Sequence, residues 1–368
     1  MKVLITGGGT GGHIYPALAI ARKIKMEYKN ADILYVGTEK GLEAELIPKE
    51  GLRFKTIRVM GFSRKLSKNT FKSIKELFLG LSDAKKVIND FKPDIVIGTG
   101  GYVCGPLVLT AALKKIPTMI HEQNAFPGVT NRILSRFVDR IAGSFEESRK
   151  YFKDTNKLVI TGNPIRQDIV GFDKQVAYED LNIDKNKPFV LSFGGSGGQK
   201  KLNDAMLEVI VKNSNNQNMQ IIHVTGKRLY ESFMKELKQK GVDELIDNIR
   251  VYPYFFEVPK ALSIADVALT SGGAIAIAEI TAVGIPSILI PKAYTTENHQ
   301  EYNARALEKN GASIVILEKD LNGELLNKEI NNLLSDKRKL RDMAIKSRKM
   351  GIINADDRIL NIVRELIS

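Results

Sequence analysis

The sequence predicts an α/β protein built from two doubly wound domains, each with a parallel sheet covered by helices on both faces. Short β-branched runs alternate with longer amphipathic stretches along the chain, a pattern typical of buried parallel strands between helices. The alternation pauses at the turn-rich segment TGNPIR, residues 161–166, and then restarts. Each half opens with a strand that leads through glycines into a helix. With 368 residues, the chain is long enough for two domains of about 100–200 residues each.

The expected strands follow in a regular order. In the first half, the apolar runs typical of buried strands are VLIT near residue 4, ILYV near 34, DIVIG near 95, TMIH near 119 and RIAG near 141. In the second half they are FVLSF near 189, IIHV near 221, IRVYPY near 249, VALT near 267, SILI near 287 and SIVIL near 313. Residues 352–367 indicate one more helix, and periodicity alone leaves open which domain it packs on.

Composition excludes several classes of protein. Hydrophobic residues make up 43% and charged residues 26% of the chain. This composition is typical of a globular protein and excludes a disordered or fibrous one. The single cysteine, Cys104, cannot form an internal disulfide, and the four histidines lack the spacing of a Cys/His metal site. The N-terminus has no secretory leader pattern, and the longest apolar stretch, 103–113, is shorter than the about 20 residues of a membrane helix. We expect a cytoplasmic protein that does not cross a membrane.

The net charge of +13 favours an anionic partner, which could be nucleic acid, a phosphorylated metabolite or an acidic lipid surface. Residues 51–75 form a local basic patch without any acidic residue. Nucleic acid is disfavoured, because the chain has no nucleic-acid motif and only 7% aromatic residues.

The first glycine-rich segment, ITGGGTGGH at residues 5–13, leaves a strand and enters a helix. Its backbone N–H groups and the positive end of the helix favour a phosphate or diphosphate ligand. Gly7, Gly9 and Gly12 match the dinucleotide pattern G-x-G-x-x-G. No acid stands at the tip of the second strand, so NAD or FAD is disfavoured. A tight turn without a ligand is the structural alternative.

Two further glycine segments lie in the second half. FGGSGGQK, residues 193–200, lets the Ser196 hydroxyl donate to a phosphate oxygen and lacks the P-loop pattern. SGGAIAIAEI, residues 271–280, places Glu279 about two turns into a helix, where it either binds a ribose diol or is an exposed surface carboxylate. No two aspartates stand two residues apart. We therefore expect helix ends and hydrogen-bond donors, and no metal, to stabilise a leaving diphosphate.

Motifs along the whole chain together resemble one enzyme family. They are GGGTGGHIYPALAIA (7–21), GTGGYVCGP (98–106), HEQNAFPG (121–128), TGNPIR (161–166), FGGSGG (193–198), AEITAVGIPSILIP (278–291) and NHQEYNA (298–304). The family is that of the peptidoglycan N-acetylglucosaminyltransferases that convert lipid I to lipid II. The combination of G-x-T-G-G-H-x-x-P with HEQN is far more specific than a lone glycine loop.

The resemblance implies a GT-B fold with two Rossmann-like domains and a cleft between them. It assigns residues 1–163 and a C-terminal helix, residues 347–368, to a membrane-facing acceptor domain, and residues 164–346 to the donor domain. The implied enzyme is an inverting, metal-independent hexosyltransferase without a cofactor, which transfers GlcNAc from UDP-GlcNAc to the MurNAc 4-hydroxyl of lipid I. The resemblance further implies a peripheral location on the cytoplasmic face of the cell membrane, roles in cell shape and division, and cell-wall machinery proteins as candidate partners.

Inversion requires a base that removes the acceptor hydroxyl proton as UDP departs. His13, at the exit of the first glycine loop, is the first candidate because a histidine titrates near neutral pH. The alternative is that His13 only caps the helix or positions a phosphate. Glu122 in HEQN is the second candidate, and its alternative is a structural role.

The family motifs imply the remaining contacts. Donor contacts are expected at Thr10, Gly11, Gly12, Asn124, Arg166, Ser196, Phe255, Ala274, Ile275, Ala276, Ile277, Ala278, Glu279, Gln300 and Asn303, with Phe255 near uracil. Acceptor contacts are expected at Gly100, Gly101 and Tyr102, together with His13.

A membrane patch is expected beside the basic run. It consists of Lys68, Lys72, Ile74, Lys75, Phe78 and Leu81, in which the apolar residues recur at helical spacing. An apolar stripe flanked by cations suits an anionic lipid surface. Each nearby Lys or Arg contributes about 1 kcal/mol to the free energy of membrane binding. The alternative is a core-facing helix with solvated lysines, and the polyisoprenyl acceptor favours the membrane.

Two related activities stay open. A glycosyltransferase that uses diacylglycerol or another lipid as acceptor shares the fold and the donor loops, but HEQN and the TGGH loop argue against it. A UDP-GlcNAc 2-epimerase also has two such domains and needs no acceptor.

Overall fold

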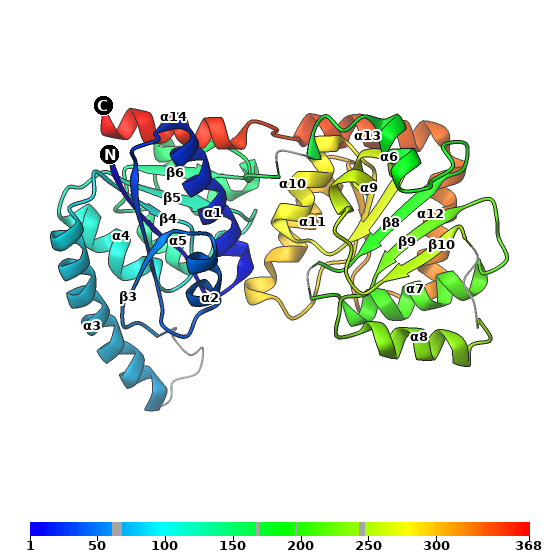
Figure 1. The fold of residues 1–368 in the computed structure, drawn as a ribbon, viewed down its shortest axis with the longest axis horizontal. Helices are drawn as coiled ribbons and strands as arrows, with labels where there is room; N and C mark the ends of the chain where they lie inside the picture. The colour runs from blue at the N-terminus through cyan, green and yellow to red at the C-terminus, as the bar shows by residue number, and fades with distance from the viewer. Residues whose placement is uncertain (61–67, 167–168, 196, 243–246) are drawn as a thin grey trace. The chain divides into compact units, whose positions relative to one another are not determined.

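The computed structural model of the protein describes residues 1–60, 68–166, 169–195, 197–242 and 247–368, with the backbone alone for 68–74. The chain divides into two compact units (Figure 1). Unit 1 comprises Met1–Pro164 and Asn354–Ser368, and unit 2 comprises Ile165–Ile353.

Unit 1 is built on a seven-stranded parallel sheet with the strand order β3-β2-β1-β4-β5-β6-β7. The strands are β1 (Lys2–Thr6), β2 (Asp32–Gly37), β3 (Arg53–Thr56), β4 (Ile95–Gly98), β5 (Thr118–Glu122), β6 (Arg140–Gly143) and β7 (Leu158–Ile160). The central strands are buried almost throughout because helices cover both faces of the sheet.

The helices of unit 1 form two layers. They are α1 (Gly11–Glu27), α2 (Leu42–Lys49), α3 (Lys68–Phe91), α4 (Cys104–Leu113), α5 (Val129–Leu134), α14 (Ala355–Ile367) and the short 3₁₀ turns η1 (Glu146–Tyr151) and η2 (Thr155–Lys157). On one face, Ile5 of β1 shares a hydrophobic core with Ile20 of α1 and Val363 of α14. On the other face, Leu4 packs in a core with residues of α3 and α4, such as Ile88. Adjacent residues of β1 thus point to opposite faces of the sheet and pack in different cores, as the pleat requires.

Unit 2 repeats the design with a six-stranded parallel sheet in the order β10-β9-β8-β11-β12-β13. The strands are β8 (Phe189–Phe193), β9 (Gln220–Val224), β10 (Ile249–Tyr252), β11 (Val267–Thr270), β12 (Ser287–Leu289) and β13 (Ser313–Val315). The helices are α6 (Lys174–Asp180), α7 (Lys200–Lys212), α8 (Tyr230–Gln239), α9 (Val258–Ile264), α10 (Ala274–Val283), α11 (His299–Lys309), α12 (Gly323–Ser335), α13 (Lys337–Met350) and the 3₁₀ turn η4 (Thr296–Asn298). Two hydrophobic cores cover its two faces. The predicted α/β architecture is confirmed in both units.

Two strands of unit 1 were not predicted, and both lie at an edge of its sheet. β3 carries exposed side chains along most of its length, and β7 has only three residues. An edge strand has a neighbour on one side only and needs less apolar surface. The segment of β3, RFKT, has no continuous apolar run, and that of β7, LVI, has one of only three residues.

The chain returns to unit 1 at Asn354, later than the expected residue 347. Helix α13 stays with unit 2 through its last turn, where the Arg348 guanidinium donates to Ala282 O. Gly351 is fitted against the end of α10, since a Cβ there would lie 2.3 Å from Thr281 O. These contacts keep residues 347–353 in unit 2.

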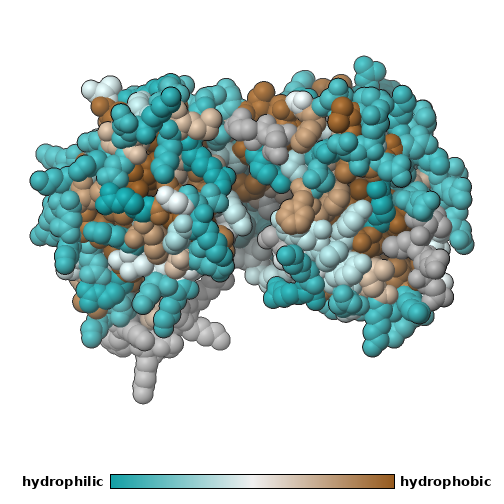
Figure 2. Space-filling model, viewed as in Figure 1, coloured by the Kyte–Doolittle hydropathy of each residue, from teal (hydrophilic) through white to brown (hydrophobic). Residues whose placement is uncertain are grey.

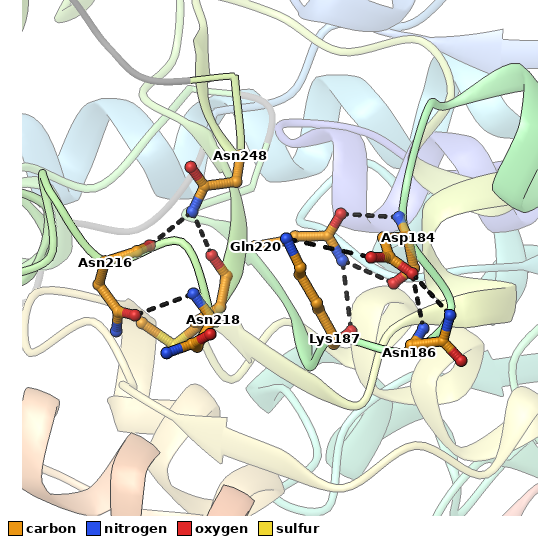
Figure 3. A network of polar contacts seen from close by, with 8 residues as sticks. Asp184, Asn186, Lys187, Asn216, Asn218, Gln220 and Asn248 are labelled. Atoms are coloured by element: carbon orange, nitrogen blue, oxygen red, sulfur yellow. Dashed lines mark hydrogen bonds and ion pairs between the residues drawn. The ribbon is translucent and has the colours of Figure 1, made fainter.

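Polar side chains close the amino edge of the sheet in unit 2 (Figure 3). Gln220, the first residue of β9, accepts from Asp184 N at 2.8 Å and donates to Asp184 O at 2.9 Å. Asn248, just before β10, donates to Asn216 O at 2.7 Å. These bonds hold the turns that precede β8, β9 and β10, while the glycine loops lie at the opposite, carboxyl edge. Hydrophilic side chains cover most of the visible face of each unit (Figure 2).

Candidate active site

Loops after three neighbouring strands meet at the carboxyl edge of the unit 1 sheet. β1 lies beside β4, and β4 lies beside β5. Gly8 N donates to Gly100 O at 3.3 Å. A Cβ at Gly101, whose φ is +82°, would lie 2.3 Å from Gly8 O. Glycine is required there because the two loops touch through their backbones.

His13 lies in the first turn of α1, with its ring directed toward the loop after β5. Its Nδ1 is 3.1 Å from Gln123 Oε1. The ring packs on Gly100, where a Cβ would lie 2.6 Å from Nδ1. Burial lowers the pKa of His13, against the opposing effects of the Gln123 side chain, the Thr99 backbone and the Glu43 charge. His13 is therefore neutral at pH 7 and able to accept a proton.

Glu122 directs its buried carboxylate into its own loop. It accepts from Asn124 N at 3.0 Å, Gly128 N at 3.1 Å and Asn131 Nδ2 at 2.8 Å. The Asn124 side-chain amide donates to it as well. Burial raises the pKa of Glu122, and these bonds oppose the rise. The geometry fits the structural alternative, because the carboxylate already organises the turn from residue 124 to 131.

Glu43 is a buried acid that the sequence analysis did not select. Its side chain is fully buried and accepts from Gly9 N at 3.1 Å, Thr38 N at 3.0 Å and Thr38 Oγ1 at 2.7 Å. A Cβ on any of three surrounding glycines would collide with it: Gly8, Gly37 and Gly41. Glu43 therefore ties the first glycine loop to the end of β2. The segment GTEKGLE, residues 37–43, directly follows a buried strand and carries the only sequence signal for this role.

The other unit 1 candidates lie closer to the surface. Thr10 is the N-cap of α1, with extended backbone, and it is exposed together with Gly12. Tyr102 has 38% of its surface exposed and borders Gly9. The first turn of α1 therefore presents backbone N–H groups and a positive helix end, as an anion site requires.

Unit 2 brings its own loops together at the carboxyl edge of its sheet. Gly198, with φ of +73°, meets the loop after β9, since a Cβ there would lie 2.1 Å from Thr225 O. A Cβ at Gly272 would lie 2.1 Å from Gln300 O. The buried Asn303 donates from Nδ2 to Gly272 O at 3.0 Å. Asn303 thus supports the loop before α10.

Lys292 is a second residue that the sequence analysis missed. Its ammonium Nζ donates to Gly198 O at 2.9 Å, and its backbone N donates to Gln300 Oε1 at 3.0 Å. Burial lowers the pKa of Lys292, and the Glu318 charge opposes this shift. A half-buried cation therefore lies against the glycine loop after β8. It follows a buried strand, but no motif distinguishes it from the many other lysines.

Arg166 and Glu279, both expected at the donor, form an ion pair within unit 2. Arg166 Nε donates to Glu279 Oε1 at 2.8 Å, and Nη2 donates to Oε2 at 3.1 Å. The Glu279 side chain is only 7% exposed, so the alternative of an exposed surface carboxylate does not apply. The pair holds the carboxylate in a fixed orientation on the second turn of α10.

The remaining donor candidates differ in accessibility. Phe255 is partly buried and stacks on Tyr252 with ring centroids 4.9 Å apart. In the first turns of α10, Ala274, Ile275, Ala276 and Ala278 are partly exposed. Ile277 is buried in the core, and its N–H donates to Gly273 O, so its side chain faces away from solvent. Ser196 lies outside the described residues.

Among the described residues, no group of three His, Cys, Asp or Glu side chains is arranged to hold a metal ion. Across the same part of the chain, no helix combines the length and apolarity needed to cross a bilayer.

Comparisons with known proteins identify the family of this chain. The N-terminal domain model of glycosyltransferase family 28 matches residues 3–143, and its C-terminal domain model matches residues 189–359. The chain belongs to glycosyltransferase family 28. The matched regions contain the first glycine loop and HEQN in unit 1, and the loops around Gly198 and Gly272 in unit 2.

Two relatives that match along the whole of this family 28 chain carry the same name. It is 50% identical over 367 residues to the UDP-N-acetylglucosamine--N-acetylmuramyl-(pentapeptide) pyrophosphoryl-undecaprenol N-acetylglucosamine transferase of Acetivibrio thermocellus, covering 100% of this chain and 98% of the relative. The protein of that name from Clostridioides difficile is 49% identical over 368 residues, covering 100% of this chain and 89% of the relative.

Solved structures share the fold of this family 28 chain. MurG from Acinetobacter baumannii matches with a TM-score of 0.78 and 27% identity, covering 99% of both chains. The UDP-GlcNAc 2-epimerase of Neisseria meningitidis, bound to UDP-GlcNAc, matches with a TM-score of 0.66 and 16% identity, covering 99% of this chain and 100% of that one. The second likeness shows the fold alone.

Proposed function

We propose that this chain transfers N-acetylglucosamine from UDP-GlcNAc to the N-acetylmuramyl-pentapeptide of pyrophosphoryl-undecaprenol, releasing UDP and forming lipid II. The observation that carries this proposal is the 50% identity, over essentially the whole length of both chains, to a transferase named for this reaction. The epimerase likeness is weaker, since it rests on 16% identity.

His13 acts as the base in this proposal. The ring is neutral, partly exposed and placed beside the N-terminus of α1, to which we assign the acceptor diphosphate. His13 takes the proton of the 4-hydroxyl of MurNAc as that oxygen bonds to the anomeric carbon of GlcNAc. The bond from this carbon to the UDP oxygen breaks, and its electron pair leaves with the diphosphate. Attack opposite to UDP inverts the anomeric configuration.

Glu122 has a supporting role in this proposal. Its carboxylate accepts bonds from Asn124, Gly128 and Asn131 within one loop. Proton transfer to Glu122 would weaken each of these bonds. We therefore assign it to the orientation of the loop that carries Asn124.

The donor is assigned to unit 2. The N–H groups of the loop after β8 and the N-terminus of α10 suit a diphosphate, and the Lys292 ammonium adds a positive charge beside Gly198. Such fixed donors stabilise the charge that develops on departing UDP. Glu279, oriented by Arg166, is suited to the ribose hydroxyls, and Phe255 is suited to the uracil.

The membrane patch is proposed on α3. The C-terminal half of this helix is buried through Ala84, Val87 and Ile88, whereas Phe78 is 68% exposed and Lys75 is exposed. Phe78 therefore lies outside the buried face of the helix, which favours a lipid-facing role on the cytoplasmic leaflet. The side chains of Lys68, Lys72 and Ile74 lie outside the described residues, and Leu81 is half-buried.

The transferase assay uses the full chain with UDP-GlcNAc and a lipid I analogue, and measures UDP release and the mass of the lipid product. We expect equal amounts of UDP and product. His13→Ala is expected to reduce kcat by about 10²–10⁴-fold, the usual contribution of a general base. Product formation from diacylglycerol instead of lipid I, or loss of UDP-GlcNAc without any acceptor, would replace this proposal with one of the related activities.

The membrane assay measures sedimentation with vesicles that contain anionic lipid. Phe78→Ser is expected to release the protein while its affinity for UDP stays unchanged. Val176→Ser is the matched control, because Val176 is an exposed apolar residue on α6 of unit 2. Equal vesicle binding by wild type and Phe78→Ser would contradict the assignment of α3. Vesicle binding also tests the proposed peripheral location, and capture by cell-wall machinery proteins is a separate experiment.

A further inference from the structure

A chain of hydrogen bonds leads from His13 into the interior of unit 1. His13 Nδ1 is 3.1 Å from Gln123 Oε1, and Gln123 Nε2 is 2.9 Å from His121 Nδ1. His121 Nε2 is 3.2 Å from Gly162 O. Both His121 and Gln123 are almost completely buried. The chain therefore joins the exposed edge of the site to a backbone carbonyl behind it.

Backbone carbonyls determine the direction of every bond in this chain, because a carbonyl oxygen can only accept. Gly162 O requires His121 Nε2 to carry a proton, so His121 Nδ1 in the neutral ring is an acceptor. Thr99 O, 2.8 Å from the Gln123 amide nitrogen, requires that atom to be the NH₂ group. Gln123 Oε1 must then face His13 and can only accept. His13 Nδ1 therefore carries a proton, and the lone pair of the neutral ring is on Nε2.

We propose that Gln123 and His121 are positioning residues that hold His13 in the Nδ1–H tautomer, so that Nε2 is the atom that accepts the proton. The part of this inference that concerns catalysis rests on the proposed function. The Nδ1–H bond to Gln123 is kept when Nε2 becomes protonated, and it strengthens because the donor is then charged. Proton transfer thus requires no rearrangement behind the ring.

A neutral amide in this position has a different electrostatic effect from a carboxylate. A carboxylate behind the ring would raise the pKa of His13 and favour the protonated, inactive form. Gln123 orients the ring without adding a charge, and His121 stays neutral because burial lowers its pKa to about 4. The negative charge of Glu43 acts to raise the pKa of His13, but burial of the ring has the larger effect and lowers it. His13 is thereby oriented and remains unprotonated at pH 7.

The first test observes the tautomers directly by NMR on the ¹⁵N-histidine-labelled full chain. The chain has four histidines, so His13→Ala and His121→Asn variants suffice to assign both rings. We expect His13 to show a protonated Nδ1 with an unprotonated Nε2, and His121 to show the reverse. An Nε2–H tautomer of His13 in the wild type would overturn the proposal without any substitution in the chain.

The second test replaces Gln123 with methionine, which has a similar length and no amide. We expect Gln123→Met to give a mixture of His13 tautomers and to reduce kcat about tenfold or more, with KM changed less, as one net hydrogen bond is lost. Gln123→Glu should move the pH profile of kcat/KM to higher pH, because the carboxylate raises the pKa of His13. Gln175→Met, at an exposed position on α6, is the control. An unchanged His13 tautomer in Gln123→Met would refute the positioning role.

A third pair of variants tests His121. His121→Asn can accept from Gln123 through its oxygen, which lies near the former Nδ1, so the His13 tautomer should survive although the bond to Gly162 O is lost. His121→Leu removes one acceptor of the Gln123 NH₂ group while Thr99 O remains, so we expect a larger share of the other His13 tautomer than in His121→Asn. The readouts separate the two proposals. If His13 shows the expected tautomer but the chain has no transferase activity, only the proposed function is rejected. If activity requires His13 but the ring has the opposite tautomer, only the positioning role of Gln123 and His121 is rejected.

Discussion

Glu43 provides the sharpest test of how unit 1 holds its first glycine loop. The fully buried carboxylate accepts from Gly9 N through one oxygen, and from Thr38 N and Thr38 Oγ1 through the other. In Glu43→Gln, the amide oxygen can keep both Thr38 bonds, and the NH₂ group then faces Gly9 N–H. The Gly9 N–H loses its acceptor and the new NH₂ group is buried without one, which costs about 1–3 kcal/mol. In Glu43→Ala all three donors lose their acceptor and a cavity forms, which costs about 3–5 kcal/mol.

Hydrogen exchange measured by mass spectrometry reports this cost locally. We expect peptides that cover residues 2–13 and 33–43 to exchange faster in Glu43→Gln, by about tenfold for each 1.4 kcal/mol, and faster still in Glu43→Ala. Peptides of unit 2 should be unaffected. Glu45→Gln is the matched control, because Glu45 lies on the same helix and its carboxylate pairs with the exposed Lys49. Wild-type exchange in Glu43→Gln would refute the idea that the loop depends on this carboxylate.

Four further predictions follow from the same contacts. Glu122→Gln should lower the melting temperature, because an NH₂ group then faces Gly128 N–H or the Asn131 amide; a normal melting temperature with lost turnover would instead make Glu122 the base. The free energy of unfolding, measured with urea, should fall as the pH decreases from about 6.5 toward about 4. Each histidine contributes a slope of at most about 1.4 kcal/mol per pH unit. The reason is that burial lowers the pKa of His121 to about 4 and that of His223 to about 3, so the unfolded chain binds these protons first; a slope unchanged in His223→Asn would contradict this. Arg166→Ala should weaken UDP binding about tenfold in calorimetry, because the Glu279 carboxylate loses its guanidinium partner. If the variant and the wild type bind UDP with equal affinity, the ion pair has no role in donor binding. EDTA should leave the initial transferase rate unchanged, and a loss restored by Mg²⁺ would show that a divalent ion takes part.

The sequence predicted those parts of the fold that depend on continuous apolar runs. β1, β4 and β5 are buried along their whole length or nearly so, and burial on both faces of a parallel strand leaves a run that can be recognised. The segment that became β3 has mostly exposed side chains, so no such run exists. The passage of the chain back to unit 1 at Asn354 depends on contacts of α13 with α10, which local periodicity does not contain.

The candidate site divides in the same way. The glycine loops and His13 were found because they follow predicted strands, and parallel strands end at one edge of their sheet. The partners of those residues were not found, because they come from distant parts of the chain: Gln123 lies 110 positions from His13, and Lys292 lies 94 positions from Gly198. Glu43 was overlooked because a buried acid can be recognised only once the three glycines that surround it are placed.

The sequence by itself determined the α/β class, the family and the loops that face a ligand, because apolar periodicity, glycine and helix starts act over a few neighbouring residues. Only the tertiary structure decided which carboxylates are buried and paired, and which nitrogen of His13 carries the proton. These properties follow from hydrogen-bond partners and desolvation, which exist only after folding has brought separate loops together and excluded water from between them.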